Sequence, residues 1–183
     1  MSAPSARTVA APSASHGLLD VKSLILLAIL LSAALILNLT VGNALAMTGI
    51  KPQFIVLAYV LTVQLTRASV AQSVLYGLIA AVFAQLSTSI PGLNLVTEPI
   101  SAIVLAFAIR ADLSVAGRDV NPLVTAFVTT LVSGCLYAVL GTVIMGAALP
   151  SALMKAPIVL TTSVFNAIVT QALIAPLRAV YKR

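Results

Sequence analysis

Two oppositely charged residues stand out in a chain that has very little charge. Glu98 is the only glutamate among 183 residues, and it lies between apolar segments. Lys51 lies in the turn-like sequence Gly49-Ile50-Lys51-Pro52. An ionised group near hydrocarbon is costly unless it is paired or faces water or protein. We therefore interpret Glu98 as part of a binding site and consider Lys51 as its counterpart.

A lysine and a glutamate together could bind a zwitterion, with Lys51 attracting a carboxylate and Glu98 an ammonium group. Neutral side chains near both residues could orient such a ligand through hydrogen bonds. The expected neutral binding residues are Asn43, Gln53, Gln85, Thr88 and Asn94, with Tyr137 and Asn166 as candidates for the inner wall. The alternatives are that Lys51 pairs with Glu98 or snorkels to lipid headgroups, and that Tyr137 packs with its hydroxyl bonded to backbone.

Catalytic residue sets are missing from the sequence. The single histidine, His16, precedes the apolar segments, and we find no Ser/His/Asp set, carboxylate pair, metal-ligand cluster or phosphate-binding loop. Cys135 is the only cysteine, which excludes an intrachain disulfide, and its apolar surroundings favour a small core residue. We expect no enzyme activity, metal or cofactor in this chain.

The composition is that of an integral membrane protein. Hydrophobic residues make up 61% of the chain and charged residues 8%, against about 45 to 50% and about 25% in soluble domains. The net charge of +6 could suggest nucleic acid as a partner. However, the cations lie singly at the ends of apolar segments without a basic stripe, which excludes that reading.

The apolar segments predict an all-α fold of six transmembrane helices. We expect residues 1–20 to be a disordered tail and residues 21–183 to form the membrane domain. The expected helices span 21–39, 52–65, 68 to about 87, 99–110, 122–146 and 156–178, with polar loops at 40–51 and 111–121. A signal peptide is the alternative for the first segment, because Ala44-Leu45-Ala46 resembles a cleavage site.

A break in the middle of the chain, residues 88–99, interrupts the apolar pattern. It contains Pro91-Gly92, which is typical of a turn, and Pro99, which suits the first turn of the fourth helix. The break therefore separates the third and fourth helices and brings Glu98 to the beginning of the fourth.

The distribution of cations predicts the orientation in the membrane. With six spans, eight cations lie on the side of the termini and two on the other side. By the positive-inside rule, both termini are cytoplasmic. The eight are Arg7, Lys22, Arg67, Arg110, Arg118, Arg178, Lys182 and Arg183, and the two are Lys51 and Lys155. The central break and the turn at 49–53 then share the outer face, as an outward-facing pocket requires.

Two ordered motifs resemble a known family. The Gly-x-Lys-Pro turn at 49–52 and the sequence from Ser87 to Pro99, in a chain of six short helices, resemble an S component of an energy-coupling factor (ECF) transporter, closest to the tryptophan transporter (TrpP) group. That group tends to have aspartate where this chain has Gln53, and Asp-Lys-Pro where it has Thr97-Glu98-Pro99.

The resemblance implies a substrate-capture subunit in the plasma membrane of a prokaryote. Such a subunit binds tryptophan or a vitamin-like compound from outside and docks on a transmembrane coupling protein with two ATPase subunits, which use the ATP. Ala28 and Ser32 resemble the small-residue docking stripe of the family's first helix. The alternatives from other classes are a non-transport assembly or structural protein of the membrane and a stand-alone small-solute facilitator.

Overall fold

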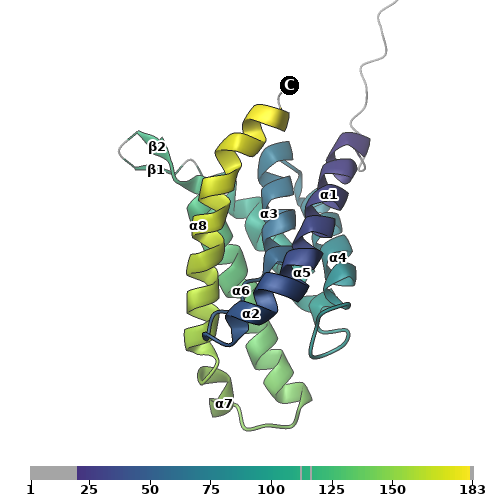
Figure 1. Cartoon of the computed structure of the whole chain (residues 1–183), viewed down its shortest axis with the longest axis vertical. Helices are drawn as coiled ribbons and strands as arrows, with labels where there is room; N and C mark the ends of the chain where they lie inside the picture. The colour runs from purple at the N-terminus through teal and green to yellow at the C-terminus, as the bar shows by residue number, and fades with distance from the viewer. Residues whose placement is uncertain (1–19, 112, 116, 182–183) are drawn as a thin grey trace, which may run out of the picture.

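The computed structural model describes residues 20–181 except 112 and 116, and these form a helical bundle (Figure 1). The elements are α1 (Val21–Leu37), the π-helical turn η1 (Asn38–Gly42), α2 (Asn43–Ala46), α3 (Phe54–Thr66), α4 (Val70–Ala84), α5 (Asn94–Ala108), β1 (Ser114–Val115), β2 (Arg118–Asp119), α6 (Asn121–Ile144), α7 (Pro150–Leu153) and α8 (Ala156–Tyr181). The helical class is confirmed, and the structure adds one hairpin whose two strands have two residues each. The tail prediction for residues 1–19 lies outside the described residues, whereas Asp20 caps α1.

Within the described residues, three helical segments are long and apolar enough to cross a membrane, namely Val21–Ala46, Asn121–Ile144 and Pro150–Tyr181. The helices α3, α4 and α5 have only 13, 15 and 15 residues. At 1.5 Å per residue they cover roughly 20 to 23 Å, less than a hydrocarbon core of about 30 Å. These lengths and compositions are typical of a membrane protein, and the six spans remain a prediction.

The short helix α3 lies at the centre of the bundle. Every residue from Phe54 to Gln64 is buried, and α3 contacts α1, α4, α5, α6 and α8. A helix that is apolar on all sides suits a position surrounded by other helices. Because α3 is enclosed, its length does not have to match the thickness of the lipid.

Both ends of the described chain meet at one end of the bundle. The Lys22 ammonium donates a hydrogen bond of 3.3 Å to the carbonyl of Tyr181 and lies 4.5 Å from the centre of its ring. Figure 1 shows α1 beginning and α8 ending at the upper end of the view. This is the arrangement that an even number of spans requires. We call this end the terminal end and the opposite one the cavity end.

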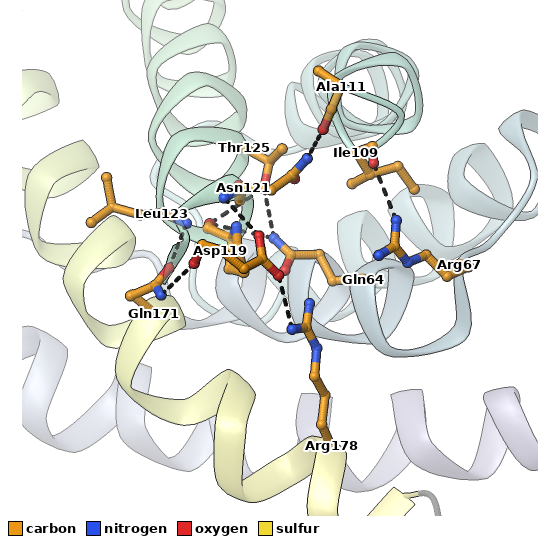
Figure 2. Close-up of polar contacts among 11 residues, drawn as sticks. Gln64, Arg67, Ile109, Ala111, Asp119, Asn121, Leu123, Thr125, Gln171 and Arg178 are labelled. Carbon is orange, nitrogen blue, oxygen red and sulfur yellow. Dashed lines mark hydrogen bonds and ion pairs between the residues drawn. The ribbon is translucent and has the colours of Figure 1, made fainter. Parts of the chain in front are cut away.

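At the terminal end, polar contacts hold the hairpin connection between α5 and α6 (Figure 2). The Arg178 guanidinium forms a 2.9 Å ion pair with Asp119, and the Gln171 amide donates to the Asp119 carbonyl at 3.0 Å. Gln64 is buried beneath them and donates to the Thr125 hydroxyl at 2.6 Å. The predicted polar loop is therefore tied to α8 at Asp119, while the β1–β2 hairpin projects from the side of the bundle (Figure 1).

The expected loop from Thr40 is wrong in its first half, because helical structure continues to Ala46. The Thr40 hydroxyl donates to the Ile36 carbonyl at 2.7 Å, and the Asn43 amide donates to the Leu39 carbonyl at 2.9 Å. Polar side chains bonded to the preceding turn can stay in a helix. The turn itself follows at residues 47–49 and ends with Gly49, whose φ is +84°.

Pro99 does not begin the fourth helix, as the sequence suggested, but lies inside α5. The chain reverses earlier, at Gly92, whose φ of +82° an L residue rarely adopts. The Thr97 amide already donates to the Leu93 carbonyl, so one turn is closed before the proline is reached. As a result Glu98 lies within a helix rather than in the break.

Glycines in the helices allow close packing of neighbouring helices. The prediction that Cys135 packs in the core is wrong. A Cβ atom on Gly77 of α4 would lie 2.8 Å from the Cβ of Ala102 and 3.0 Å from the carbonyl of Glu98 on α5. Gly134 of α6 meets Val159 of α8 in the same way. Cys135 is exposed, because the next residue on a helix is turned away from the packed face.

Replacing Gly77 by alanine is expected to separate α4 from α5, because neither Ala102 nor the Glu98 backbone can move aside. Overpacking of this kind costs about 1 to 3 kcal/mol. The Gly77→Ala variant should unfold at a lower temperature by circular dichroism in detergent. Gly42→Ala is the matched control, since its Cβ would meet nothing closer than 3.4 Å. Equal stability of both variants would contradict the packing argument.

Candidate functional site

A cavity of about 380 Å³ lies between the helices at the cavity end of the bundle. It is bounded by the first turns of α3, α5 and α8, by the segment after α4, and by the second half of α6. Ile55, Val56, Ile158 and Val159 contribute apolar wall, while Lys51 and Glu98 contribute charge. Cavities of roughly 300 to 1,000 Å³ with few polar groups are typical of small-molecule sites.

Glu98 lies at the inner side of this cavity and is only 5% exposed. Its Oε1 accepts a 2.7 Å hydrogen bond from Ser133 of α6 and a longer one from Thr97. Its Oε2 accepts a 3.1 Å bond from the Tyr59 hydroxyl of α3. Three hydroxyl donors therefore fix the carboxylate, and three helices meet at it.

The helical register of α5 explains why Glu98 reaches the cavity. Asn94 and Glu98 are four residues apart and so lie on one face of the helix. Both are buried and both line the cavity. The early start of α5 thus creates a two-residue polar face, which the predicted start at Pro99 would not have produced.

Lys51 lines the cavity, but it does not pair with Glu98. Across the described part of the chain, the ion pair between Arg178 and Asp119 is the only salt bridge. The Lys51 side chain is exposed, while its carbonyl accepts a 3.0 Å hydrogen bond from Thr162 of α8. The segment that carries this cation is therefore attached to α8.

Gln53 lines the cavity, and Asn166 lies directly behind it. The Asn166 amide donates to the Gln53 carbonyl at 3.1 Å and to the Thr130 hydroxyl at 3.2 Å. The side-chain oxygens of Gln53 and Asn166 are buried and have no hydrogen-bond partner in the described structure. Asn166 is thus a positioning residue, and Gln53 has an acceptor to offer a ligand.

Thr88 and Tyr137 meet at the rim of the cavity. Their hydroxyl oxygens are 3.0 Å apart, and the Tyr137 oxygen accepts a 3.1 Å bond from the amide of Ile90. The alternative for Tyr137, in which its hydroxyl bonds to backbone, is confirmed, and the residue also lines the cavity. Tyr137 therefore holds the segment after α4 against α6.

Besides Asn166, two other predicted binding residues do not line the cavity. Gln85 accepts a 2.8 Å bond from the amide of Gly92 and donates to the Ala81 carbonyl, so it stabilises the turn. Asn43 is exposed and bonded to its own helix. Ala28 and Ser32 are exposed on α1, where they are free for contact with lipid or another protein.

Sequence reasoning missed several residues of the site. Ser133 and Thr130 belong to a series of hydroxyl residues at helical spacing in α6, and that pattern could have indicated a polar face. Tyr59 gives no such signal, because the residues that flank it directly in the sequence, Ala58 and Val60, are apolar. Asn38 and Lys155 also line the cavity. Among the residues described, no three His, Cys, Asp or Glu side chains are placed to hold a metal ion together.

Comparison with known proteins does not assign this chain to a family. No family model, curated protein or solved structure matches it. The features that indicate a function are the cavity, its charges and its position in an apolar bundle.

Proposed function

We propose that the chain is the substrate-capture subunit of an ECF-type importer in a prokaryotic plasma membrane. It binds tryptophan or another small metabolite, such as a vitamin-like compound, from the outer face. The observation that carries this proposal is the cavity of about 380 Å³ that contains both Lys51 and Glu98. A cavity of this size that carries charges of both signs matches a small ligand with an ammonium and an acidic group.

The proposed ligand orientation follows from the hydrogen bonds of Glu98. A carboxylate has about four lone-pair sites, and Thr97, Ser133 and Tyr59 occupy three of them. The remaining capacity of this fixed carboxylate is available to the ammonium of a ligand. Lys51 at the rim then attracts the ligand's carboxylate, while Gln53 offers an additional acceptor.

The proposed transport cycle draws its energy from partner proteins. We infer six spans with both termini in the cytoplasm, a transmembrane coupling protein and two ATPase subunits that use ATP. The outward face of α1 suits docking, because Ala28 and Ser32 are small and exposed there. The Ser32 hydroxyl bonds to the Ala28 carbonyl, so it brings no unpaired donor to an apolar interface.

One observation favours a stand-alone facilitator as the second candidate. On the side of the cavity that faces the terminal end, Thr129 of α6 and Thr170 of α8 are buried, and their hydroxyls have no partner in the described structure. Further along, Gln64 and Thr125 bond to each other near the terminal end. These side chains form a polar seam that could become hydrated and extend the cavity across the bundle.

Thermal unfolding of the purified chain against tryptophan, other amino acids and B vitamins tests the proposal first. A ligand that binds only the folded state raises the unfolding midpoint by mass action, and we expect a saturable rise with one compound. The absence of a rise with every compound would favour a non-transport structural protein. Uptake by the chain alone in liposomes would favour the facilitator.

Substituting the two charged residues tests the ligand orientation. Glu98→Gln and Lys51→Ala should each weaken binding of the zwitterion by about tenfold or more, since each removes a hydrogen bond to a charged group. Isothermal calorimetry would measure this. Arg110→Ala, at the other end of the bundle, is the control and should bind normally. Wild-type affinity in both cavity variants would contradict the orientation.

Enlarging the small residues of α1 tests docking. Ala28→Leu together with Ser32→Leu should prevent copurification with the coupling protein and ATPases, because close helix approach needs small side chains. Ligand binding should be unchanged, since neither residue lines the cavity. Leu substitutions at Ile25 and Ile29, which are exposed on the same helix and already large, are the matched control. Copurification of the first variant at the wild-type level would exclude this surface.

A further inference from the structure

We propose that Lys155 acts with Lys51 as a second cation of the cavity, so that the ligand carries an acidic group and a net negative charge. The acidic group is a carboxylate or a phosphate. This inference rests on the proposed function and narrows its substrate class, because a simple zwitterion such as tryptophan would leave one cation without a counter-charge.

Both lysines are attached to the same end of α8. Lys155 immediately precedes α8 and lines the cavity. Its ammonium is partly buried and donates a 3.2 Å hydrogen bond to the Thr142 hydroxyl of α6. Lys51 is linked to α8 through the bond from Thr162 to its carbonyl. The cations therefore belong to the α8 side of the cavity, whereas Glu98 reaches it from α5.

The charges that line the cavity do not balance. Lys51 and Lys155 contribute two positive charges and Glu98 one negative charge. In the described part of the chain, neither lysine forms a salt bridge. A net positive cavity in an apolar bundle favours an anion, and the beginning of the 26-residue helix α8 adds a partial positive charge on the same side.

The remaining walls indicate an amphipathic ligand. Ile158 and Val159 follow Lys155 on α8, and Ile55 and Val56 face the cavity from α3. An acidic head at the two lysines would place the body of the molecule against these side chains. A donor group on the far end could then reach Glu98 or the free oxygen of Gln53. The phosphate of a lipid headgroup has the same acidic chemistry, so the experiment must distinguish a free anion from a lipid headgroup.

Inorganic phosphate is the probe for this subsite. We would measure the unfolding midpoint of the full chain in nanodiscs of zwitterionic lipid while phosphate replaces chloride at constant ionic strength. We expect a saturable rise in the midpoint. The phosphate concentration at half-saturation should be about tenfold or more higher in Lys51→Met and in Lys155→Met. Lys22→Met removes the same charge at the terminal end and should respond as the wild type does.

Three results would overturn the inference. They are the absence of a rise with phosphate, a half-saturation in both cavity variants equal to that of the wild type, and an equal rise when chloride is titrated in place of phosphate. The test is repeated in nanodiscs that contain anionic phosphatidylglycerol. If the phosphate response is lost there, and this loss requires both Lys51 and Lys155, the subsite belongs to a lipid headgroup instead. If an organic zwitterion binds while phosphate does not, the importer proposal stands and only the anion subsite fails.

Discussion

The arrangement of the bundle depends on one buried carboxylate. Glu98 is surrounded by the hydroxyls of Tyr59, Ser133 and Thr97, which come from α3, α6 and α5. A charged group taken out of water costs several kcal/mol unless such donors replace the water. The donors therefore fix the rotation of the central helix α3 relative to α5 and α6. A cavity of defined shape follows, because its polar and apolar sides cannot exchange places.

The long and short helices have different tasks. The segments containing α1, α6 and α8 have the length and apolar surface that contact with lipid requires. The shorter α3 is enclosed, and every residue from Phe54 to Gln64 is shielded. A short central helix leaves room at the cavity end, beyond its first turn, and the cavity lies there, beside Pro52 and Gln53. The site thus results from a difference in helix length as much as from any single side chain.

The sequence was sufficient to identify the helical class and two of the three charged residues that line the cavity, Lys51 and Glu98, since these follow from composition and from residues that are rare in an apolar chain. It was misleading about local boundaries. Thr40 and Asn43 look like loop residues, but each bonds to the preceding helical turn. Pro99 looks like a helix start, but Gly92 had already reversed the chain. Tyr59 could not be found, because its partner is 39 residues away and only packing brings them together.

The rim of the cavity is held on both sides by hydrogen bonds to backbone. Thr162 and Asn166 of α8 bond to the carbonyls of Lys51 and Gln53, and Tyr137 of α6 bonds to the amide of Ile90. Gly134 lets α6 and α8 pack tightly, so the two anchors cannot easily move apart. A rim of this kind is ordered before a ligand arrives, which lowers the entropy lost on binding. Discrimination between ligands would then come from the fit to a fixed shape, with little adjustment of the protein to each molecule.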